Sequence, residues 1–182
     1  MAKLISKTYG DALFDAVMEQ NKVEEVLSDV KELKEVLKNS PDLKDYLNNT
    51  SVPEEHKTEA VAELFEGRAD DITVGFLMTV IRKGRFGEID KTLDYFIERV
   101  KEYKKIGVAY VTSAVSLNED EKKQIEQKLL SVTDYSEFEI NYTIDPAIIG
   151  GLVIRIKDRV FDNSIKNRLD DLSGQLMRIH LS

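Results

Sequence analysis

Residues 144–172 read IDPAIIGGLVIRIKDRVFDNSIKNRLDDL. An Asp-Pro break and a Gly-Gly pair precede an apolar run over 152–156, which predicts a strand; Val160 and Phe161 predict a short return strand. One of the three residues at 162–164 then supplies an N-cap for a final helix, because Asp, Asn and Ser are all good caps. The stretch has no pattern typical of a catalytic site, so it predicts packing and shape, and function must come from surfaces.

The residues before this stretch extend the same small domain. Valine, tyrosine and threonine over 107–115 predict a strand, and Asn118 with Glu121 predicts a capping box that opens a charged helix. Apolar residues at 138, 140, 142 and 144 alternate with polar ones, which is the period of a half-buried strand. Residues 106–182 are therefore expected to form a small mixed β-sheet domain with two helices.

The first hundred residues have helical periodicity instead. Apolar residues recur at the i, i+3, i+4 spacing in six segments, and Pro41, Gly84 and Gly87 lie between segments. Ser51 and Glu54 have the spacing of a capping box before the fourth segment. The fifth segment, 71–82, is apolar on nearly every side. The predicted fold class is α+β, with a six-helix bundle over 1–105 followed by the sheet domain.

Composition excludes several classes of function. The chain has 182 residues with 34 acidic and 26 basic ones, a net charge of -8, which works against non-specific binding to nucleic acid or anionic lipid. Without cysteine it has no disulfide or thiol chemistry, which fits a reducing compartment. The longest uncharged run, 106–118, is too short to span a bilayer, and no apolar signal segment opens the chain.

The residues that could carry reaction chemistry are few. His56 and His180 are the only histidines, and both are expected on the solvated surface, so a zinc site lacks ligands. Gly150 and Gly151 precede a strand, whereas phosphate-binding loops open a helix. The acidic clusters lack the alternating spacing of a calcium loop. The sequence therefore predicts no enzyme, no cofactor and no metal.

Three segments resemble the delta subunit family of bacterial F-type ATP synthases, which is related to the mitochondrial oligomycin-sensitivity-conferring protein. Residues 145–172 are similar to its C-terminal signature, residues 9–14 (YGDALF) to its first helix, and residues 75–85 (GFLMTVIRKGR) to its fifth helix. One departure is Gly10, where the family usually has alanine; glycine inside a helix costs about 0.5–1 kcal/mol. The signature residues carried over are Asp145, Gly150, Gly151, Asp162, Ser164, Ile165, Leu169 and Leu172.

The resemblance implies a mechanical role at the top of the peripheral stalk. Such a protein, present in one copy per complex, links the alpha/beta catalytic head to the b subunits, so that proton-driven rotation is coupled to ATP synthesis. Residues 1–105 would bind the head by receiving the N-terminus of an alpha subunit, and residues 106–182 would hold the C-terminal helices of the b subunits. The protein would lie at the cytoplasmic face of the cell membrane without inserting into lipid. The groove residues that the resemblance implies are Tyr9, Ala12, Leu13, Phe76, Leu77 and Val80.

Other interpretations stay open at this point. Each groove residue has an equally plausible role in the bundle core, since an aliphatic stripe is more often core than contact, and the same applies to Ile165, Leu169 and Leu172. A generic helical adaptor with an appended sheet domain also fits the absence of active-site chemistry. A small enzyme using a carboxylate pair is the remaining alternative.

Overall fold

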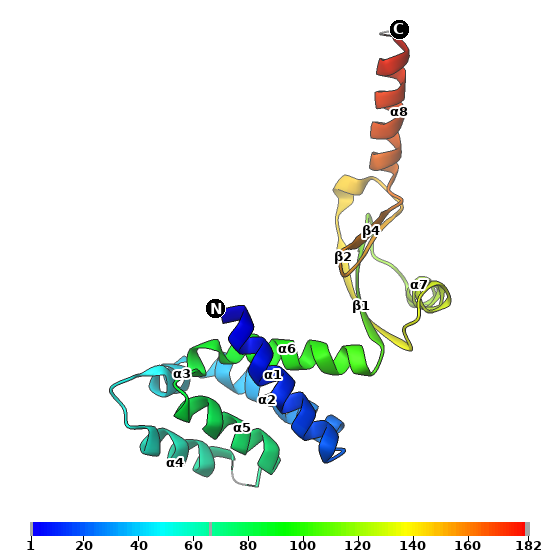
Figure 1. Ribbon diagram of the computed structural model, residues 1–182. Coiled ribbons are helices and arrows are strands. Elements are labelled where there is room, and N and C mark those ends of the chain that lie inside the picture. The colour runs from blue at the N-terminus through cyan, green and yellow to red at the C-terminus, as the bar shows by residue number, and fades with distance from the viewer. Residues whose placement is uncertain (1, 66, 181–182) are drawn as a thin grey trace. The chain divides into compact units, whose positions relative to one another are not determined.

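The computed structural model describes residues 2–65 and 67–180 and divides into two compact units, Met1–Lys101 and Glu102–Ser182. The described residues form eight α-helices and one four-stranded mixed sheet (Figure 1). The predicted α+β class is therefore confirmed. Each unit has a hydrophobic core of its own.

The first unit is helical. Its elements are α1 (Ala2–Glu19), α2 (Val23–Asn39), α3 (Pro41–Asn48), α4 (Glu54–Phe65), α5 (Asp71–Arg82), the 3₁₀ turn η1 (Phe86–Glu88) and α6 (Ile89–Tyr103). Because α4 begins at Glu54, Ser51 lies before the N-cap position, and the predicted capping pair of Ser51 and Glu54 is wrong. The backbone N–H of Ser51 instead donates to Asn49 Oδ1 (2.9 Å), within the turn that follows α3.

Apolar stripes from these helices form one continuous core. α6 supplies Ile89, Leu93, Phe96 and Val100, all fully buried. Ion pairs join the helices at the rim of this core, from Lys34 to Asp94 and from Lys44 to Asp90. Other large side chains of the first unit that are fully buried include Val17, Val26, Val30, Leu33, Val61, Leu77 and Val80.

α1 approaches α6 closely at Gly10. A Cβ atom on Gly10 would overlap Cδ1 of Tyr95, and the Tyr95 hydroxyl donates to Asp11 Oδ1 (2.8 Å), which holds the ring in place. The glycine that the sequence indicates as a local weakness of α1 is thus a packing requirement. Its cost in helix propensity is offset by the contact that it permits between two helices.

The second unit contains β1 (Ile106–Ser113), α7 (Glu119–Val132), β2 (Glu137–Ile144), the 3₁₀ turn η2 (Pro146–Ile148), β3 (Leu152–Ile156), β4 (Arg159–Asp162) and α8 (Ile165–His180). The strand order is β2-β1-β3-β4. β1 and β2 are parallel, which requires a crossover, and α7 provides it; β3 pairs antiparallel with β1 and β4. The predicted capping box is confirmed, because Asn118 Oδ1 accepts from the Glu121 N–H and the Glu121 carboxylate accepts from the Asn118 N–H, each at 2.8 Å.

The core of this unit is small. Ala109, Leu129, Phe138 and Ile156 are buried where α7 lies against the sheet. The alternation over 138–144 does form a strand, but its burial ends early, since Ile144 is 55% exposed. The alternation of apolar and polar residues therefore predicts which face of the sheet a side chain lies on. Whether that side chain is buried depends on how much of the face α7 covers.

We expect Gly10→Ala to lower the free energy of unfolding by roughly 1 kcal/mol. Alanine gains about 1 kcal/mol in helix propensity, but displacing a packed ring typically costs about 1–3 kcal/mol, and the shift also disturbs the Tyr95–Asp11 hydrogen bond. Urea denaturation followed by circular dichroism measures the change. In a Tyr95→Ala background the same substitution should stabilise the protein by about 0.5–1 kcal/mol. A stabilising effect of Gly10→Ala in the parent chain would show that the ring does not constrain α1.

Candidate functional site

Polar contacts hold the start of α5 against the N-terminal half of α2. Asp70 is the N-cap, and its Oδ1 accepts from the Ile72 N–H (2.9 Å) while its Oδ2 pairs with Lys22 Nζ (2.5 Å). Asp29 of α2 accepts from the Asp70 N–H (2.6 Å) and from Thr73 Oγ1 (3.2 Å). The Lys22 hydrogen bond, followed by that of Ile72, lowers the pKa of Asp70, and the Asp70 hydrogen bond raises the pKa of Lys22. α5 is therefore fixed by charge at its first turn.

α1 and α5 contact each other, so the structure brings the six predicted groove residues to one region. Their exposures differ. Leu13, Leu77 and Val80 are at most 2% exposed and belong to the core of the unit. Tyr9 and Phe76 are half-buried at the edge of that core, and Ala12 is exposed.

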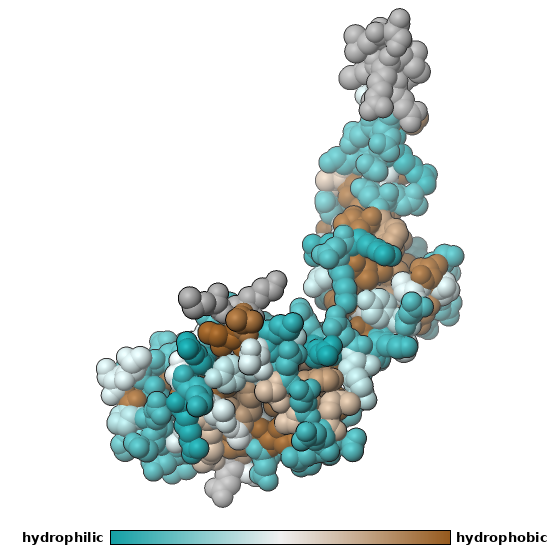
Figure 2. Space-filling view, in the orientation of Figure 1, coloured by the Kyte–Doolittle hydropathy of each residue, from teal (hydrophilic) through white to brown (hydrophobic). Residues whose placement is uncertain are grey.

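The six predicted groove residues therefore fall into two sets, a buried set beneath the surface and a set that solvent can reach. The three buried side chains hold α1 against α5 and present no free area, whereas Tyr9, Ala12 and Phe76 offer the atoms that a peptide can touch. Figure 2 shows apolar residues reaching the surface of the first unit near the start of α1, where Leu4 is 70% exposed. Leu4 was not among the predicted groove residues, although an exposed leucine at the start of a helix is a signal that the sequence contains.

The signature in the second unit builds the start of α8. Asp145 Oδ1 accepts from the Ala147 N–H (2.9 Å) and so begins η2. A Cβ on Gly150 would come within 2.8 Å of Ile165 Cδ1, and the Gly150 N–H already donates to the Ile148 carbonyl (2.8 Å). That amide is therefore occupied, which agrees with a backbone role for the glycine pair rather than a phosphate-binding loop.

Gly151 allows two backbone segments to touch. Its φ is +79°, and a Cβ there would overlap the Asn163 carbonyl oxygen. Two hydrogen bonds close the contact, from Asn163 N–H to the Leu152 carbonyl (3.0 Å) and from Ile165 N–H to the Gly150 carbonyl (2.9 Å). A side chain at 151 would push these segments apart.

Ser164 resolves the choice of cap for the final helix. Its side chain is buried, and its Oγ accepts from the Asn167 N–H (3.1 Å), three residues into α8. Asp162 Oδ1 accepts in turn from the Ser164 N–H (2.9 Å), and the hydrogen bonds from the Ser164 side chain and backbone lower the pKa of Asp162. The residues of the signature thus cap and orient a helix.

α8 then presents an apolar stripe to solvent. Ile165, Leu169 and Leu172 are 44%, 52% and 54% exposed, so these side chains are not core. Sequence periodicity leaves both the core and the surface role open for these residues, and their exposure decides for the surface. Figure 2 shows further apolar residues at the surface of this unit around the sheet, and Ile149 and Phe161 are among its exposed apolar side chains.

The first unit also exposes apolar residues that sequence reasoning missed. Val36, Tyr46 and Leu64 are 40%, 37% and 42% exposed. Val36 is out of phase with the buried stripe of α2, which includes Leu33 and Leu37. That mismatch is the signal by which the sequence distinguishes Val36 from a core residue.

Metal-binding clusters and membrane-spanning helices are both absent from the part of the chain that the structure describes. No cluster of three or more His, Asp or Glu side chains with metal-binding geometry occurs there. His56 is exposed and lies 3.8 Å from Glu59, and the side chain of His180 is outside the described residues. Among the described helices, none combines the length and the apolar character needed to cross a membrane.

Comparison with known proteins gives concordant results. The family model described as ATP synthase delta (OSCP) subunit matches residues 5–176. A relative from Lachnoclostridium phytofermentans, "ATP synthase subunit delta", is 48% identical over 181 residues, which cover 100% of both chains. A protein of the same name from Clostridium perfringens strain SM101 is 33% identical and covers 98% of this chain and 99% of its own.

The fold is also found in a solved structure. A chain of the cryo-EM structure of the Toxoplasma gondii mitochondrial ATP synthase hexamer superimposes with a TM-score of 0.72. The match covers 94% of this chain and 97% of that chain at 19% identity, so it shows a shared fold.

We expect Gly151→Ala to destabilise the second unit by more than about 1 kcal/mol, because alanine is strained at this positive φ and its Cβ overlaps the Asn163 carbonyl. The matched control is Gly75→Ala on the exposed face of α5, where no atom lies within 4 Å of the added Cβ and helix propensity should stabilise by about 0.5–1 kcal/mol. Chemical denaturation measures both. Equal effects of the two substitutions would contradict the backbone contact that positions α8.

Proposed function

This chain belongs to the ATP synthase delta (OSCP) subunit family, and we propose that it acts as a non-catalytic peripheral-stalk protein that links the alpha/beta catalytic head to the b subunits. The observation that carries the proposal is the family match along nearly the whole chain, combined with exposed apolar surfaces on both units. A linker needs two such surfaces, one for each partner.

The first unit is the proposed head-binding part, acting as one six-helix bundle. A peptide helix from the N-terminus of an alpha subunit would lie along α1 and α5 and contact Tyr9, Ala12 and Phe76 above the buried floor of Leu13, Leu77 and Val80. Helix-in-groove binding uses apolar anchors of this kind. The contacts of Asp70 with Lys22 and Asp29, here called the charged clamp at Asp70, support this role, because they fix α5 in place before any peptide binds.

The second unit is the proposed stalk-binding part. Ile165, Leu169 and Leu172 follow one another at intervals of four and three residues, which is the spacing of helices that pair along an apolar seam. The sequence continues that spacing with Leu176 and Ile179. The partner that fits is another long helix, which favours the C-terminal helices of the b subunits.

The proposed role of the protein is to keep the catalytic head from turning with the rotor. Rotation of the rotor is coupled to ATP synthesis only if the head stays still, so this protein supplies binding energy at both ends rather than reaction chemistry. One copy per complex at the cytoplasmic face of the membrane, reached through protein partners, fits the net charge of -8.

For the head side, we expect Ala12→Asp and Phe76→Asp each to weaken binding of a synthetic peptide from the alpha-subunit N-terminus at least tenfold, about 1.4 kcal/mol. Each places a charge in an apolar contact that the bound helix would desolvate. Isothermal titration calorimetry measures the affinity, and circular dichroism verifies the fold. Ala12 is exposed, so its substitution leaves the core intact even if Phe76→Asp proves destabilising.

The control is Met78→Asp, which adds the same charge at another half-buried position of α5. Two residues turn an α-helix by about 200°, so Met78 lies on the opposite flank from Phe76. The Met78→Asp variant should bind the alpha-subunit peptide with the same affinity as the parent chain. A parent chain that fails to bind the peptide, at a salt concentration where it is folded, would overturn the head-binding role.

For the stalk side, we expect Leu169→Asp to weaken binding of a C-terminal segment of the b subunits at least tenfold, because the charge falls within the apolar stripe of α8. Asn167→Asp is the matched control, since it adds one charge about 200° around the same helix. Analytical ultracentrifugation of the mixtures measures both. Equal loss in the two variants would indicate a general charge effect, and no loss in either would place the b subunits elsewhere.

A further inference from the structure

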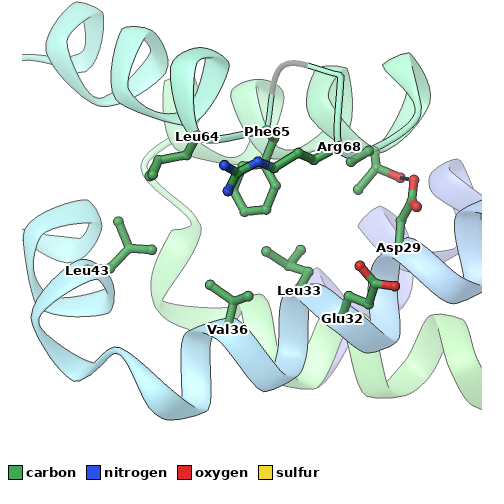
Figure 3. A pocket seen from close by; sticks show the side chains of 10 residues that line it. Asp29, Glu32, Leu33, Val36, Leu43, Leu64, Phe65 and Arg68 are labelled. Atoms are coloured by element: carbon green, nitrogen blue, oxygen red, sulfur yellow. Dashed lines mark hydrogen bonds between the residues drawn. The ribbon is translucent and has the colours of Figure 1, made fainter.

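A cavity of about 230 Å³ opens between α2, α3, α4 and the start of α5 in the first unit. Figure 3 shows Leu33 and Val36 of α2 on one side of it, Leu43 of α3 at one end, and Leu64 and Phe65 of α4 on the other side. Leu33 is 2% exposed and forms a floor, whereas Val36 and Leu64 reach the surface at the mouth. One part of the cavity is therefore apolar from its floor to its entrance.

The apolar surface extends beyond the cavity. Tyr46, one turn after Leu43 on α3, is 37% exposed and lies outside the pocket lining. A ligand that fits only inside the cavity would leave this area and much of Val36 and Leu64 in water. An occupant that covers the whole patch must therefore be larger than the pocket.

Figure 3 shows Asp29 and Glu32 at the end of the pocket away from Leu43, whereas the guanidinium of Arg68 extends from that end toward Leu64. Asp29 is already used, since it accepts hydrogen bonds from the Asp70 N–H and from Thr73 Oγ1. Glu32 and Arg68, both exposed, line the pocket and have no ion pair among the residues that the structure describes. The mouth thus offers one negative and one positive group to an incoming ligand.

The volume of the cavity distinguishes between a whole small-molecule ligand and a single side chain as its occupant. Pockets for whole small-molecule ligands are about 300–1,000 Å³, larger than this one. An apolar cavity of about 150 Å³ is known to hold benzene, so a single aromatic ring fits here with room to spare. Aromatic side chains that fill a pocket at the centre of an apolar patch are typical anchors of protein contacts.

We propose that this pocket receives one aromatic side chain of a partner polypeptide, whose neighbouring residues include a basic one that faces Glu32 and an acidic one that faces Arg68. The residues that line this site include none of Tyr9, Ala12 and Phe76, so it is a second docking surface, separate from the one proposed on α1 and α5. It does not depend on the proposed function, because its support comes from the pocket, its exposed rim and its two charges.

The first experiment tests the anchor by nuclear magnetic resonance on the full ¹⁵N-labelled chain. N-acetyl-tryptophanamide should shift the backbone amides of Val36, Leu64 and Ala69 and saturate with a Kd on the order of 1 mM. N-acetyl-alaninamide should not shift them. Leu64→Ser should weaken binding at least fivefold and Val36→Trp, which fills the pocket from within, should abolish it; both positions are exposed, so the fold is kept.

Leu4→Ser is the matched control, because it removes an exposed leucine from the same unit away from the pocket. Its affinity for the tryptophan probe should equal that of the parent chain. Absence of saturable shifts at the pocket amides, or equal weakening by Leu4→Ser and Leu64→Ser, would overturn the proposal.

The second experiment tests the two charges with end-blocked tripeptides. Lys-Trp-Glu should bind severalfold more tightly than the tryptophan probe, and Glu32→Gln and Arg68→Gln should each remove part of that gain. Equal affinity of both probes would refute the charged rim. If the chain instead self-associates in sedimentation and Leu64→Ser restores a monomer, the occupant is a second copy and the proposed partner is wrong.

Discussion

At Gly151 the turn before β3 touches the segment after β4, and no side chain fits between them. Two backbone hydrogen bonds hold the contact, and Ser164 caps the helix that starts there. The start of α8 is therefore determined by backbone atoms rather than by side-chain packing. The exposed stripe of Ile165, Leu169 and Leu172 depends on this contact, because these side chains stay about half exposed and do not anchor the helix in the core of the unit.

In the first unit, side-chain packing and polar contacts position the helices. Its helices are joined by a continuous apolar core, and the close approach at Gly10 and the charged clamp at Asp70 fix α1 and α5 individually. A rigid frame is useful to a protein that binds, since residues already in place lose less entropy when a partner arrives. Most of the apolar content of α1 and α5 maintains the frame, and only its flank is available for contact.

These features describe a protein whose function lies in surfaces. The exposed apolar residues gather on α8, around the sheet and between α2 and α4, while the described His, Asp and Glu side chains form no cluster with metal-binding geometry. Membership of the ATP synthase delta (OSCP) subunit family places these surfaces in the peripheral stalk of a complex of many subunits. Apolar surface on each of two units suits such a place, because each unit can then contact a neighbouring subunit by a surface of its own.

The sequence by itself determined the secondary structure, the α+β class and the family. Periods of 3.6 and 2 residues, the Asn118 cap and the glycine pair at 150–151 are local signals, and the structure reproduces the elements they indicate. Only the tertiary structure decided which apolar residues are exposed to solvent and so available to a partner. Leu13 and Ala12 are neighbours on one helix, as are Leu33 and Val36, yet the first of each pair is buried and the second is exposed. The reason is physical: burial depends on atoms supplied by helices distant in the chain, and the requirement for Gly10 comes from a tyrosine on α6.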